Sequence, residues 1–76
     1  MCDAKQHHPA MIQAARNLNE WAREKGITMR EQAECTDVPY TLLRQAEKGV
    51  MPDRATATQL EEICRFFGRQ LHELFR

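Results

Sequence analysis

The sequence has no surplus of charge of either sign and no long apolar run. Its 11 Lys and Arg residues balance 11 Asp and Glu residues, so the formal net charge is +0 and the isoelectric point is near 6.8. No overall positive field therefore attracts nucleic acid. The apolar stretches are too short to cross a bilayer, and the N-terminus lacks the apolar segment of a secretion signal. We expect a cytoplasmic protein without a membrane partner.

Cysteine is also scarce. Cys2, Cys35 and Cys64 are odd in number and widely spaced, which fits neither a disulfide framework nor a zinc site. His7 and His8 stand near Cys2, but adjacent histidines in a segment without periodicity rarely make a defined metal site. We expect no metal, no cofactor and a reducing compartment.

The chain is short for an enzyme. Its 76 residues leave no room for a second domain, while 42% hydrophobic and 29% charged residues are ordinary for a folded globular protein. A chain of this size buries only about 60% of the surface of its unfolded form, so a partner subunit would matter for stability. The sequence also offers no constellation for metal or redox catalysis. We expect neither an enzyme nor a small-molecule substrate.

The spacing of apolar residues predicts an all-α chain of five helices behind a loose arm at residues 1–8. The helices are expected at residues 9–25, 29–34, 39–48, 56–68 and 70–75. Their buried faces are predicted to carry Met11, Ile12, Ala15, Leu18, Trp21 and Ala22 in the first helix, Leu42, Leu43 and Ala46 in the third, Leu60, Ile63, Cys64 and Phe67 in the fourth, and Leu71, Leu74 and Phe75 in the fifth.

Local signals mark where these helices begin and end. Gly26 stands where a left-handed residue closes the first helix, and Gly68 closes the fourth. The segments 28–31 and 56–59, Thr-Met-Arg-Glu and Thr-Ala-Thr-Gln, are capping boxes that open the second and fourth helices. Pro39 restricts Val38 to extended angles and can itself begin the third helix.

Over residues 18–75 the chain resembles the Cro and phage-repressor (XRE) family. The resemblance is carried by Gly26, Ile27, Thr28 and Glu31, by Ala33 at a helix crossing, by Val38 before the third helix, by Glu47, Lys48 and Gly49, and by the segment from Gly68 through Leu71 to Phe75. It implies a lambda-repressor-like helix-turn-helix domain over residues 9–76. It also implies a sequence-specific, DNA-binding transcriptional regulator, working as a homodimer on a pseudo-palindromic operator.

Several positions depart from the family pattern. Met29 replaces a Gln that contacts a phosphate, and Gln32 replaces a buried aliphatic residue. Ala22 stands where the family places an Arg, which leaves Glu47 without that partner. These departures indicate a weakened DNA contact and an altered turn.

The third helix is the expected groove reader. With Leu43 and Ala46 turned inward, its outward residues are Tyr40, Thr41, Arg44 and Gln45. Arg suits the O6 and N7 atoms of guanine, Gln suits adenine, and Thr suits a thymine methyl or a phosphate. Tyr in the first turn suits a phosphate or a methyl group.

Phosphate contacts are expected from residues flanking this helix, namely Thr28, Arg30, Lys48 and Arg54. Acidic residues outnumber basic ones around them. The segment 28–54 contains Arg30, Arg44, Lys48 and Arg54 against Glu31, Glu34, Asp37, Glu47 and Asp53. Binding should therefore be weak for a monomer and sensitive to salt.

Each of these residues also has a plain structural interpretation. Arg44 and Gln45 suit a solvated helix face, and the ring of Tyr40 suits packing over the turn. Lys48 suits a helix C-terminus, and Arg54 suits an ion pair with Asp53. The alternative function is a protein-interaction module derived from a helix-turn-helix domain, such as an antitoxin or a phage accessory factor.

A homodimer would be formed through the C-terminal region. Phe66 and Phe67 are adjacent, so both rings cannot face one interior. We expect the dimer interface to contain Phe66, Leu74 and Phe75.

Overall fold

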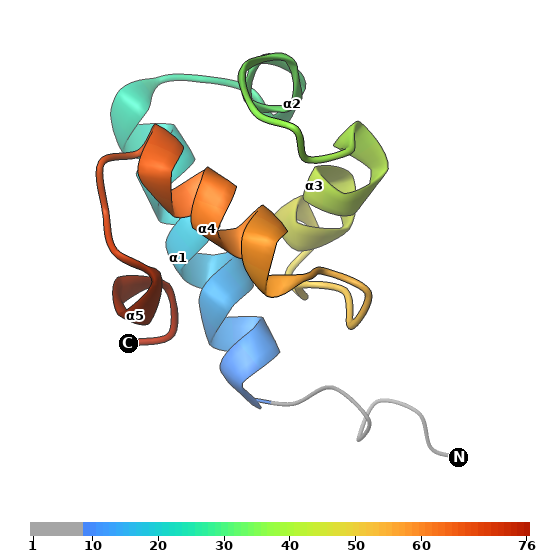
Figure 1. Cartoon of the computed structure of the whole chain (residues 1–76), viewed down its shortest axis with the longest axis vertical. Coiled ribbons are helices and arrows are strands. Elements are labelled where there is room, and N and C mark those ends of the chain that lie inside the picture. The colour runs from blue at the N-terminus through green and yellow to red at the C-terminus, as the bar shows by residue number, and fades with distance from the viewer. Residues whose placement is uncertain (1–8) are drawn as a thin grey trace.

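Five α-helices form the computed structural model, which describes residues 9–76 (Figure 1). Within this range there are no strands, which confirms the predicted all-α fold of five helices. In chain order the helices are α1 (Pro9–Lys25), α2 (Met29–Cys35), α3 (Tyr40–Glu47), α4 (Ala57–Phe66) and α5 (Leu71–Leu74). The predicted arm at residues 1–8, with Cys2, His7 and His8, lies outside the described residues.

The two glycine stops are confirmed. Gly26 has φ +71° and Gly68 has φ +69°, a region in which an L side chain is strained. After α1 the amide of Ile27 donates to the Ala22 carbonyl over 3.1 Å, and after α4 the amide of Arg69 donates to the Cys64 carbonyl over 2.8 Å. Each of these bonds joins an amide to the carbonyl five residues earlier, and it satisfies a carbonyl that the end of a helix otherwise leaves without a partner.

Both predicted capping boxes are present. The amide of Glu31 donates to Thr28 Oγ1 over 3.1 Å, and the Thr28 amide donates back to Glu31 Oε1 over 2.7 Å. Thr56 and Gln59 make the same pair of bonds over 3.1 and 3.0 Å. The first turns of α2 and α4 are therefore fixed by residues within four positions of each other.

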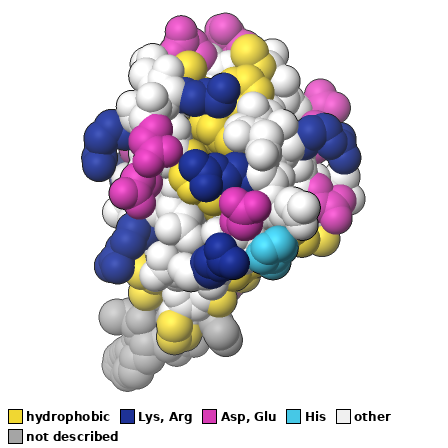
Figure 2. All heavy atoms as spheres, turned by 90° about the vertical axis from the view of Figure 1, so that its left-hand side faces the viewer, with side chains coloured by type: hydrophobic (Ala, Val, Ile, Leu, Met, Phe, Trp, Pro, Cys, Tyr) yellow, Lys and Arg dark blue, Asp and Glu magenta, His cyan; other side chains and the backbone are white. Residues whose placement is uncertain are grey.

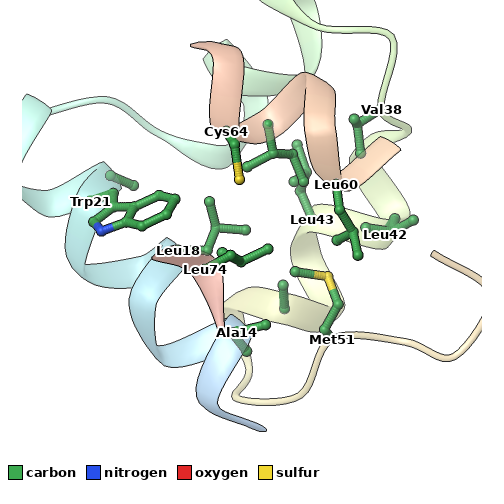
Figure 3. Close-up of a cluster of buried hydrophobic side chains, with 14 of the residues drawn as sticks. Ala14, Leu18, Trp21, Val38, Leu42, Leu43, Met51, Leu60, Cys64 and Leu74 are labelled. Carbon is green, nitrogen blue, oxygen red and sulfur yellow. The ribbon is translucent and has the colours of Figure 1, made fainter. Parts of the chain in front are cut away.

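The core lies where α1, α3, α4 and α5 meet (Figure 3). α1 packs against α3 and α5, α4 packs against α5, and α2 packs against α3. The buried faces predicted for α3 and α4 are confirmed: Leu42, Leu43, Ala46, Leu60, Ile63, Cys64 and Phe67 are all buried. Met51, in the connection between α3 and α4, is also fully buried, although nothing in its local sequence pattern indicates this.

The buried face of α1 differs from the prediction at one position. Ile12 is 38% exposed, and fully buried Ala14 lies on the core-facing stripe with Ala15 and Leu18. At about 100° per residue, position 12 falls at the side of a stripe that runs through positions 11, 14, 15 and 18. Apolar spacing alone does not define the centre of the stripe, and for this reason it predicts a core position for Ile12.

The C-terminal region corrects one expected interface residue. Leu74 is 0% exposed and belongs to the core, so it has no surface for a second copy and its assignment to a dimer interface is wrong. Phe66 and Phe75 are half-buried against the core. Phe67 occupies the interior, 5.8 Å from the Trp21 ring, with Phe66 packed edge-on against it at 5.1 Å. One Phe thus fills the core while its neighbour stays partly accessible.

Candidate nucleic-acid interface

α2 and the turn after it hold α3 at the surface of the molecule. Val38, the apolar residue before the third helix that carries part of the family resemblance, is buried in this turn. Its amide donates to Thr36 Oγ1 over 3.3 Å, while the Thr36 hydroxyl donates to the Gln32 carbonyl over 2.9 Å. The turn is thereby tied both to the core and to the last turn of α2.

The outward face of α3 is polar. Leu42, Leu43 and Ala46 are buried, so the helical periodicity leaves the next positions facing solvent. Thr41, Arg44 and Gln45 are exposed, and Tyr40 is half-buried. All four predicted base-reading residues therefore lie on the accessible side of one helix.

Three of the predicted contact residues form a connected chain of side chains. The Arg30 guanidinium of α2 lies 4.9 Å from the centroid of the Tyr40 ring. Arg44 Nη1 donates to Tyr40 Oη over 3.4 Å, and Arg44 Nε lies 3.7 Å from Glu47 Oε1. The hydrogen bond to Tyr40, with a smaller effect from Glu47, raises the pKa of Arg44 above its ordinary value.

Glu47 therefore has a partner other than the one that the family resemblance would place at position 22. Ala22 cannot pair with it, but Arg44 on the preceding turn of the same helix does. This exposed ion pair adds little stability. The Glu47 carboxylate partly neutralises the Arg44 cation on the polar face of α3. Because Glu47 lies beside Nε and Tyr40 accepts from one N–H of Nη1, the N–H bonds of Nη2 and the second N–H bond of Nη1 remain available.

A second pair joins the loop to the polar face. Arg54 Nη1, from the connection between α3 and α4, donates to Gln45 Oε1 over 3.3 Å. Both side chains line an open, mostly apolar groove of about 470 Å³; its lining residues are Gln45, Lys48, Val50, Met51, Pro52, Asp53 and Arg54. The ion pair with Asp53 that local sequence suggested for Arg54 is not formed.

Thr28 lies at another hollow beside the same face. This hollow, of about 400 Å³, is lined by Asn19, Ala22, Arg23, Ile27, Thr28, Met29 and Glu47. Arg23 is a cation near the predicted phosphate contacts that sequence reasoning missed. It belongs to the last turn of α1, five residues before Thr28, and the packing of α1 against α3 brings it beside Glu47.

Gln32 is a buried polar residue beneath this region. It is 0% exposed in α2, its Nε2 donates to Met29 Sδ over 3.7 Å, and its Oε1 has no hydrogen-bond partner. A buried acceptor without a donor costs about 1–3 kcal/mol. An aliphatic residue would therefore suit this position better, as the family pattern suggests.

The opposite side of the molecule, where α5 lies, carries acidic and basic side chains interspersed (Figure 2). Arg69 there lies within 3.5 Å of both Glu24 and Glu73. No single charge dominates this face.

Other site types find no support in the part of the chain that the structure describes. No group of three His, Cys, Asp or Glu side chains is arranged to hold a metal among residues 9–76. No helix in that range is long and apolar enough to span a membrane. Cys35 and Cys64 are both free thiols, and burial raises the pKa of Cys64.

Comparisons with models of known protein families, with curated proteins and with solved structures find no match to this chain.

Proposed function

We propose that this protein binds duplex DNA in a sequence-specific manner and regulates transcription, with α3 placed in the major groove. One observation carries the proposal: α3 buries Leu42, Leu43 and Ala46 and presents Thr41, Arg44 and Gln45 to solvent on a single exposed face. A short helix that is anchored by its apolar side and exposes Arg, Gln and Thr has the side chains that read base edges. The lambda-repressor-like assignment is part of this proposal.

Arg44 is the principal reader. The two N–H bonds of Nη2 and the second N–H bond of Nη1 are not used by Tyr40 or Glu47. Two such parallel donors match the O6 and N7 acceptors of guanine. Thr41 contacts a thymine methyl or a phosphate. Tyr40, in the first turn of α3, contacts a phosphate or a methyl group, and its hydroxyl accepts the hydrogen bond that positions Arg44.

Phosphate contacts fix the position of α3. Arg30, Lys48 and Arg54 are exposed around it, and the Thr28 hydroxyl, which accepts from Glu31, keeps its own proton to donate. This is a small number of cations. Affinity should therefore fall steeply with salt, and a homodimer that doubles the contacts would suit the site. Phe66 and Phe75 are the proposed dimer contacts on a pseudo-palindromic operator.

Fluorescence anisotropy of a labelled random duplex, measured from about 50 mM salt upward, tests the proposal. We expect binding at low salt that weakens as salt rises, and selection from a random oligonucleotide pool should enrich related half-sites. Absence of binding at about 50 mM salt would overturn the proposal.

The second candidate is a protein-interaction module, and the Arg44–Glu47 ion pair favours it. This pair, 3.7 Å long, offers a protein partner both signs of charge, whereas Glu47 repels a phosphate backbone. Under this alternative, α3 would be covered by a protein, and Glu47→Gln would leave duplex binding undetectable. If DNA is the ligand, removing the acidic charge should strengthen duplex binding severalfold.

A further inference from the structure

The connection between α3 and α4 places a cation directly on a predicted base reader. Arg54 Nη1 lies 3.3 Å from Gln45 Oε1, and both side chains are exposed and line the same groove. These two residues are nine positions apart in the chain and belong to different elements. No local pattern indicates that they meet.

The contact changes the hydrogen-bonding character of Gln45. A free Gln amide offers one acceptor and two donors, and it reads adenine by accepting from N6 while donating to N7. Here the acceptor, Oε1, is engaged by a guanidinium. One of the two lone pairs of Oε1 is used in this way, and any further donor at this oxygen would lie beside the guanidinium cation, which repels the positive end of an N–H bond. The other groups that the pair offers to a base edge are the two N–H bonds of Gln45 Nε2 and the remaining N–H bonds of Arg54, all of which donate.

We propose that the Arg54–Gln45 pair acts as a single donor-rich reader that selects guanine over adenine at the base pair it meets. Guanine presents two acceptors in the major groove, N7 and O6, whereas adenine presents one acceptor and the N6 donor. The adenine amino group would face mainly donors on the protein, and the remaining lone pair of Gln45 Oε1 lies beside the Arg54 cation. This inference rests on the proposed DNA binding and specifies which base Gln45 recognises.

Arg54 is thus a specificity-determining residue as well as a phosphate contact. Removing its side chain frees Gln45 Oε1 and restores the amide to its usual adenine preference. Lys48 provides the matched control, because it is a cation that lines the same groove and its side chain makes no hydrogen bond or ion pair with Gln45 in the structure.

The experiment compares selected binding sites of the wild-type protein with those of Gln45→Ala, Arg54→Met and Lys48→Met. The position whose preference is lost in Gln45→Ala identifies the base pair that Gln45 contacts. Anisotropy with two duplexes that carry G or A at this position then gives an affinity ratio for each variant. All substituted side chains are exposed, and thermal melting confirms that the variants are folded.

We expect the wild type and Lys48→Met to prefer G by about tenfold, and Arg54→Met to shift that ratio toward A by about tenfold. Lys48→Met should lower affinity for both duplexes alike and reduce the salt dependence. A wild-type preference for A, an unchanged G preference in Arg54→Met, or no position affected by Gln45→Ala would overturn this inference while leaving DNA binding in place. A wild-type protein that binds no duplex would overturn both proposals.

Discussion

The side-chain amide of Asn19 in α1 donates to the Ala46 carbonyl, at the C-terminal end of α3, over 3.1 Å. It also reaches the Glu47 carbonyl over 3.4 Å. The C-terminal carbonyls of a helix have no partner within the helix, so this side chain supplies one from another element. Asn17 does the same for α5, donating to the Leu74 carbonyl over 2.8 Å. α1 thereby fixes the ends of two helices through amides two residues apart.

Asn19→Ala and Asn17→Ala form a matched pair. Each should lower the free energy of unfolding by about 1 kcal/mol, since each removes a hydrogen bond to a helix end. Only Asn19→Ala should also weaken duplex binding, because only Asn19 positions α3. Urea unfolding and anisotropy measure the two effects. Equal loss of DNA affinity in both variants would show that α3 is not specifically positioned by Asn19.

Gln32→Met should stabilise the protein. The substitution nearly preserves side-chain volume and removes the buried Oε1 that lacks a partner, so the free energy of unfolding should rise by about 1–2 kcal/mol. Gln45→Met is the control at an exposed position and should change stability by less than about 0.5 kcal/mol. A lower urea midpoint for Gln32→Met than for the wild type would mean that Gln32 is satisfied in solution.

Arg44→Ala should weaken binding to the selected operator on the order of tenfold to a hundredfold and relax one base preference. Arg65→Ala is the comparison, because Arg65 is likewise exposed and paired with an acidic residue three positions away, Glu62 at 3.2 Å. Arg65 lies on α4, away from the polar face of α3, and its removal should leave affinity nearly unchanged. Equal losses in the two variants would indicate a general effect of charge without readout by Arg44.

The two capping threonines separate stability from binding. Thr28→Ala and Thr56→Ala should each cost about 1 kcal/mol of unfolding free energy, since each removes the hydroxyl that accepts the third backbone amide of the helix, from Glu31 or Gln59. If the Thr28 hydroxyl also donates to a phosphate, Thr28→Ala alone should weaken duplex binding severalfold. Thermal melting and anisotropy on the same samples decide this, and identical binding by both variants would remove Thr28 from the site.

We expect the free energy of unfolding to fall in alkaline solution because of Cys64. Burial raises the pKa of its thiol, so above about pH 8.5 the unfolded chain releases this proton while the folded protein retains it. The contribution of Cys64 to stability is therefore complete below that pH and decreases as the pH rises toward the folded pKa. Urea midpoints at pH 7 and pH 10 measure the change, and Cys64→Ala should reduce it.

Iodoacetamide should label exposed Cys35 well before Cys64.

The local sequence determined where the helices begin and end. Thr28 and Glu31, Thr56 and Gln59, Gly26 and Gly68 act on partners within five positions, so their bonds form wherever the rest of the chain lies. The apolar periodicity of α3 and α4 likewise determined which of their faces is buried, and with it the outward position of Thr41, Arg44 and Gln45.

Only the tertiary structure decided how these elements contact each other. Met51 is buried because the loop crosses α1, where its amide donates to the Met11 carbonyl over 3.1 Å, and Leu74 is buried because α5 packs on α1. The contacts of Asn19 with Ala46 and of Arg54 with Gln45 join different elements. Such contacts depend on the relative placement of whole elements, which is set by packing of the complete core and has no signature in any short segment.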